Sequence, residues 1–118
     1  MSREIDRQVA EKVMGWVRVK GPFGNPALGT IHEYGWKAPD GDIRAEVPAY
    51  SDDIAVAWKV LERCRLHVFP VADRWGAAES VDAIDGRRGF RDVRVADTAP
   101  QAICLAGLEV AKTWLLAE

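Results

Sequence analysis

Two short stretches of the chain constrain its fold most strongly: residues 51–60 (SDDIAVAWKV) and residues 97–106 (DTAPQAICLA). Each places small polar or acidic residues immediately before an alanine-rich apolar run, which is the pattern of a capped helix start. In the first stretch we expect Ser51 to be the N-cap, followed by two aspartates in the first turn, where the helix dipole favours carboxylates. The stretch therefore predicts a helix over residues 52–65.

The second stretch predicts a helix over residues 99–116. Thr98 and Gln101 have the spacing of a capping box, and only two charged residues interrupt the apolar run that follows. A further helix is expected over residues 3–14, where apolar residues recur every four positions and most charged residues lie off that stripe.

The rest of the chain has the composition of strands and turns. Residues 17–50 hold five of the ten glycines and four of the six prolines, which excludes helix over most of that segment. Residues 21–26 are expected to form a loop, and Asp85-Gly86 is the strongest hairpin signal in the chain. Short strands are expected at residues 16–19, 30–34, 43–47, 66–71, 80–84 and 89–95.

The order of these elements predicts an α+β fold. Three helices would cover one mainly antiparallel sheet, an alpha-beta-alpha sandwich formed by residues 1–118 as a single domain. A hydrophobic fraction of 48% and a charged fraction of 29% are typical of globular proteins. No apolar run reaches the roughly 18 residues that a membrane span needs, and no secretory signal opens the chain, so we expect a cytoplasmic protein without a membrane partner.

The cysteines and two of the tryptophans are expected inside the core. Cys64 and Cys104 fall in apolar helical stretches without a disulfide or CxxC pattern, so buried free thiols are favoured over a bridge between two helices. Trp58 and Trp114 lie in the predicted helical stripes and are expected to be buried there.

Three blocks of the sequence resemble a known family. They are residues 5–16 (IDRQVAEKVMGW), residues 50–58 (YSDDIAVAW) and residues 96–106 (ADTAPQAICLA). In order and spacing these blocks are similar to the Phage ABA sandwich domain family, small phage or prophage proteins of unassigned function. The resemblance implies helix, sheet and helix layers and a bacterial host cell as the place of action. It transfers no catalytic residues.

No constellation in the sequence points to catalysis, a metal or a cofactor. His32 and His67 are the only histidines, and their spacing to nearby carboxylates matches no metal motif. A nucleophilic role for either cysteine would need an activating histidine beside it. We therefore expect no cofactor and no enzyme activity, with an uncharacterised enzyme as the third-ranked hypothesis.

Arginines and aromatic residues supply the best candidates for a binding site. The predicted hairpin carries Arg87, Arg88, Arg91 and Arg94, and the other candidates are Arg74, Trp75, Trp36 and Tyr34. Arginine beside an aromatic ring suits contact with an acidic or phosphate-bearing surface. The main hypothesis is a phage accessory protein that binds a host protein and inhibits it, for instance a defence enzyme.

Two further hypotheses on partners stay open. The alternative to a host protein is a pocket for a small anionic ligand such as a nucleotide, held by Arg44, Arg74 or Arg88. Nucleic acid is an unlikely partner because the formal net charge is −2. The sequence does not indicate an oligomeric state.

Overall fold

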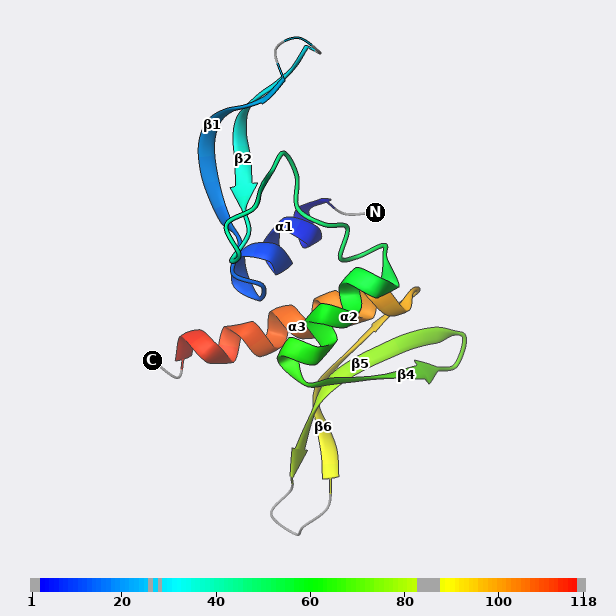
Figure 1. Ribbon diagram of the computed structural model, residues 1–118. Helices are drawn as coiled ribbons and strands as arrows, with labels where there is room; N and C mark the ends of the chain where they lie inside the picture. Colours follow the sequence, from blue (N-terminus) through cyan, green and yellow to red (C-terminus); the bar gives the residue numbers. More distant parts are fainter. Residues whose placement is uncertain (1–2, 26, 28, 83–87, 117–118) are drawn as a thin grey trace.

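The computed structural model describes residues 3–25, 27, 29–82 and 88–116 (Figure 1). The predicted helices at residues 3–14, 52–65 and 99–116 are confirmed, with ends shifted by at most two residues. Along the chain, the elements are α1 (Arg3–Lys12), β1 (Val17–Asn25), β2 (Thr30–Lys37), β3 (Ile43–Arg44), α2 (Ile54–Cys64), β4 (Leu66–Val71), β5 (Arg74–Asp82), β6 (Arg88–Ala96) and α3 (Ala99–Leu116). None of the described helices is long and apolar enough to cross a membrane.

The strands form two separate antiparallel sheets, ordered β1-β2-β3 and β4-β5-β6. The α+β class is confirmed, but the expectation of one continuous sheet is wrong. The sheets lie on opposite sides of the helices (Figure 1). Strand β3 is only two residues long, and α2 follows it before β4 begins. Among the described residues, the two sheets share no strand.

Helix α3 is the centre of the core. It packs on the β4-β5-β6 sheet and is contacted by both α1 and α2. Ile103 and Cys104 on this helix are fully buried, and Gly107 lets α2 come close. A Cβ atom at Gly107 would lie 2.7 Å from Cγ1 of Val60. Both Cys64 and Cys104 are buried free thiols, as the sequence predicts.

The N-cap predicted for α3 is confirmed, whereas the one predicted for α2 is wrong. Thr98 caps α3 as expected, since its Oγ1 accepts the N–H of Gln101 at 3.3 Å. The N-cap of α2 is Asp53 rather than Ser51, because the Asp53 carboxylate accepts the N–H of Ala55 at 3.0 Å. Ser51 is instead buried in the turn before the helix, where its own N–H donates to Asp6.

The two tryptophans assigned to helical stripes are partly exposed, so that prediction is wrong. Trp58 has 48% of its surface exposed and Trp114 has 37%. The buried stripe of α2 runs through Ala57, Val60 and Cys64. Trp58 is one position, and therefore about 100°, away from Ala57 around the helix. The guanidinium of Arg63 lies over the ring of Trp114, with its central carbon 5.7 Å from the ring centre.

Strands β1 and β5 extend furthest beyond their predicted ranges. Strand β1 continues through residues 21–25, where a loop was expected, and its pairing with β2 shifts register between Lys20 and Phe23. A bulge of this kind accommodates Pro22 inside a strand. Strand β5 starts at Arg74, directly after a tight turn in which Ala72 has a φ of 55°. The antiparallel pairing of β5 with β6 is confirmed, and the Asp85-Gly86 turn lies outside the described residues.

Candidate functional site

Strands β1 and β2 form a two-stranded projection, here called the ribbon, that extends away from the helices (Figure 1). Its register places Arg18 opposite Trp36 and Lys20 opposite Tyr34. Side chains directly opposite each other in an antiparallel pair share one face. Two cations and two aromatic residues therefore lie on the same face of the ribbon, which we call the cationic-aromatic face.

The side chain of Arg18 organises this face. Its guanidinium carbon lies 5.2 Å from the ring centre of Tyr34 and 5.5 Å from that of Trp36. At these distances the ring faces attract the cation. Tyr34 has 50% of its surface exposed, whereas Trp36 has 3%. Tyr34 and Arg18 are therefore available to a partner, while Trp36 holds the base of the ribbon.

The segment that follows β3 is tied to α1 through an ion pair. Arg7 donates to Glu46 from Nη2 at 2.7 Å and from Nε at 3.2 Å, which is a bidentate contact. The hydrogen bond from Arg7 lowers the pKa of Glu46 and so favours the charged form of this carboxylate. Both residues line a shallow hollow with Arg18, Tyr34 and Trp36. The hollow lies beside the cationic-aromatic face.

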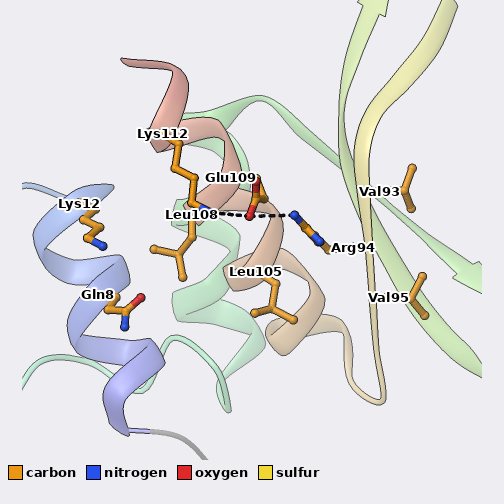
Figure 2. Close-up of a pocket in the computed structure, with 9 residues that line it drawn as sticks. All are labelled: Gln8, Lys12, Val93, Arg94, Val95, Leu105, Leu108, Glu109 and Lys112. Atoms are coloured by element: carbon orange, nitrogen blue, oxygen red, sulfur yellow. Dashed lines mark hydrogen bonds and ion pairs between the residues drawn. The ribbon is translucent and has the colours of Figure 1, made fainter. Parts of the chain in front are cut away.

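A cleft of about 530 Å³ lies between α1, α3 and β6 (Figure 2). Its charged lining residues are Lys12 from α1, Arg94 from β6, and Glu109 and Lys112 from α3. Glu109 accepts from Arg94 at 2.8 Å and from Lys112 at 2.9 Å. The hydrogen bond from Lys112 is the largest cause of the lowered pKa of Glu109, and the hydrogen bond from Arg94 lowers it further. The cleft thus carries three cations and one carboxylate.

A comparison with models of known protein families gives a match. The model of the Phage ABA sandwich domain matches residues 7–108, most of the chain. The chain belongs to this family. No match was found among curated proteins or among solved structures. The matched part of this phage domain includes both sheets, α2 and the first half of α3.

The four arginines predicted to form a binding site on the hairpin of this phage domain do not form one patch among the described side chains. Arg87 lies outside the described residues, and only the backbone positions of Arg88 and Arg91 are described, opposite Asp82 and Glu79. Arg94 points toward α3 and bonds Glu109, so it has a structural role that the sequence did not reveal (Figure 2). Its position between sheet and helix makes it a lining residue of the cleft.

The other candidates also lie apart. Arg74 pairs with Asp97 at 3.1 Å, and its neighbour Trp75 points to the opposite face of β5 because side chains alternate along a strand. Arg44 pairs with Asp42 at 2.9 Å in the other sheet. Arg44 and Arg74 therefore belong to different sheets, and each already pairs with an aspartate, so the two do not contribute to one anion pocket.

Sequence reasoning missed two parts of the phage domain's surface. The role of Arg18 could have been predicted. Arg18 and Lys20 are two residues apart, as are Tyr34 and Trp36, so in a strand each pair lies on one face. Lys12 and Lys112 give no such signal. They come together only because α1 packs on α3, and the sequence does not specify that packing.

Proposed function

We propose that this phage domain acts by binding a host protein, and that the cationic-aromatic face of the ribbon makes the contact. The observation that carries the proposal is the stacking of Arg18 on Tyr34 while half of the tyrosine stays exposed. Tyrosine and arginine are enriched among the residues that dominate protein interfaces. Holding them together before binding lowers the entropy lost on association.

The chemistry of this face favours an acidic protein surface over a nucleic acid. Arg18 and Lys20 are exposed cations, so carboxylates on a partner would complement them. A nucleobase would have to stack on an aromatic ring, but Trp36 is buried and the Tyr34 ring already carries Arg18. The protein-partner hypothesis therefore accounts for more of the geometry.

Inhibition is the mode of action that we propose for this contact. The molecule measures 62 × 37 × 18 Å, and the ribbon projects at one end of it (Figure 1). A narrow projection can enter the concave active site of an enzyme, where substrates also bind. The domain belongs to a phage family, and we propose a host enzyme, such as a defence enzyme, as the class of target.

The test is capture of the partner from host lysate by the tagged chain. The double variant Arg18→Glu, Tyr34→Ala removes the cationic-aromatic pair, and we expect at least a 10-fold loss of affinity. Lys37→Glu is the matched control, because Lys37 lies opposite Val17 on the other face of the ribbon. Equal capture by the double variant and the control would reject the ribbon face. The recovered enzyme should lose activity when the wild-type chain is added.

A further inference from the structure

The cleft in Figure 2 borders the free edge of a strand. Val93, Arg94 and Val95 all line it, although consecutive side chains of a strand point to opposite faces. Arg94 points toward α3, and the two valines point away from it (Figure 2). A space that touches three consecutive residues must therefore reach the backbone at the edge of β6.

This edge has hydrogen-bonding capacity for another strand. Within the described sheet β6 pairs with β5 on one side only. The other side of an edge strand presents backbone N–H and C=O groups that no neighbouring strand uses. Strand β6 runs for nine residues, so the edge is long enough to pair with an extended segment.

The walls of the cleft determine which kind of segment would fit. Leu105 and Leu108 on α3 are half-buried and give it an apolar floor. Arg94 and Lys112 are held in position by Glu109, whereas Lys12 has no ion-pair partner in the described part of the chain. With three cations and one carboxylate, the cleft attracts negative charge next to an apolar surface.

We propose that this cleft binds an acidic, partly apolar peptide segment of a partner protein as an added strand on β6. Strand addition takes its affinity from main-chain hydrogen bonds and its specificity from the alternate side chains that face the receiving domain. Those side chains would be apolar over the leucines and acidic beside Lys12 and Lys112. The site is separate from the cationic-aromatic face, so it does not depend on the function proposed for the ribbon.

The experiment uses the full chain and a labelled peptide of about eight residues, a usual strand length. Every second residue of this peptide is threonine. The residues between the threonines, which would face the cleft, alternate between valine and aspartate. We expect fluorescence anisotropy to give a dissociation constant below about 1 mM at low salt. Lys12→Glu should weaken binding about 10-fold, whereas Lys59→Glu, an exposed lysine change on α2, should leave it unchanged.

Further arms separate strand addition from other occupants. A peptide with N-methylated backbone amides at alternate positions should bind at least about 10-fold more weakly if its N–H groups pair with β6. The backbone N–H groups of Val93, Arg94 and Val95 that face the cleft should become protected from hydrogen exchange only when peptide is present. Protection without peptide, together with a dimer in sedimentation, would assign the edge to a second copy and overturn the proposal.

Three other outcomes would overturn it as well. The first is an absence of binding below about 1 mM. The second is equal binding by the Lys12→Glu and Lys59→Glu variants. The third is displacement of the peptide by inorganic phosphate at equal concentration, which would reveal a simple anion site. None of these results bears on capture through the ribbon.

Discussion

Asp6 on α1 accepts a hydrogen bond from the backbone N–H of Ser51, 45 residues later, at 2.8 Å. Both residues are buried. The bond fixes the turn that precedes α2 against the first helix. A carboxylate in this position replaces the water that would otherwise satisfy a buried N–H group. The contact thus sets where α2 begins and explains why the sequence places a polar residue in the otherwise apolar stripe of α1.

Replacing Asp6 by alanine should lower the free energy of unfolding by about 2–3 kcal/mol, because the buried N–H of Ser51 loses its acceptor. Asp6→Asn keeps an acceptor oxygen and should cost less. Glu4→Ala is the control, since Glu4 is exposed on the same helix and accepts a solvent-exposed hydrogen bond from Gln8. Urea denaturation measures all three. A cost for Asp6→Ala as small as that of Glu4→Ala would contradict the structural role.

Ile103→Ala and Trp58→Ala should have clearly different effects. Ile103 is fully buried on α3, so its truncation should cost about 2–5 kcal/mol. Trp58 is 48% exposed, which reduces the expected cost to about 1 kcal/mol, well below that of a buried tryptophan. Thermal or urea unfolding distinguishes the two variants. If Trp58→Ala proved the more harmful change, the face of α2 that is described above as buried would be incorrect.

Gly107→Ala should destabilise the protein although alanine is the better helix former by about 1 kcal/mol. The added methyl group would lie 2.7 Å from Cγ1 of Val60 and would force α2 and α3 apart. We expect a net cost of about 1–3 kcal/mol. Val60→Ala makes room for that methyl group. The double variant should therefore be more stable than the sum of the single effects predicts, and strict additivity would argue against the close contact.

The two thiols should react slowly in the folded protein. Burial raises the pKa of Cys64 to about 11 and that of Cys104 to about 12. Because the thiolate is the reactive form, labelling by a disulfide reagent at neutral pH should be about 100-fold or more slower than in denaturant. Fast labelling of both cysteines without denaturant would contradict their burial.

The same pKa shifts predict how stability changes with pH. The folded pKa values exceed those of unfolded thiols, so folding is favoured by the neutral thiols below about pH 8.5. This contribution is lost as the pH rises toward the folded values. A Cys64→Ala, Cys104→Ala variant should therefore lose less stability than the wild type between about pH 8.5 and pH 11 in urea titrations. Parallel pH profiles for both proteins would be evidence against the shifts.

The helices could be predicted from the sequence because their signals are local. Thr98 and Gln101 are three residues apart, and the cap they form needs no information from elsewhere in the chain. Asp53 and Ser51 show where this reasoning stops. Both residues are good caps, and the choice between them follows from the contact of Ser51 with Asp6 on another helix. A local pattern cannot contain that contact.

The arrangement of strands and the candidate sites depended on distant pairing. Residues 17–37 alternate in a way that suits a strand in either sheet, and only the pairing of β2 with β1 and with β3 makes them a sheet of their own. The cleft is a stronger case. Lys12 and Arg94 are 82 positions apart in the sequence and become neighbours through the packing of α1 and the sheet on α3. From the sequence, Arg94 was predicted to be a binding residue for a different reason, its place in the hairpin.

The separation of the two sheets also affects how this domain can evolve. The ribbon is attached to the helical core at its base, where Trp36 is buried, and beyond that point Tyr34 and Ile31 face solvent. Substitutions there change few contacts that stabilise the core, so most of them cost little stability. A domain built in this way can accept substitutions on the outer part of the ribbon one residue at a time, while natural selection on folding acts mainly on the helices and the second sheet.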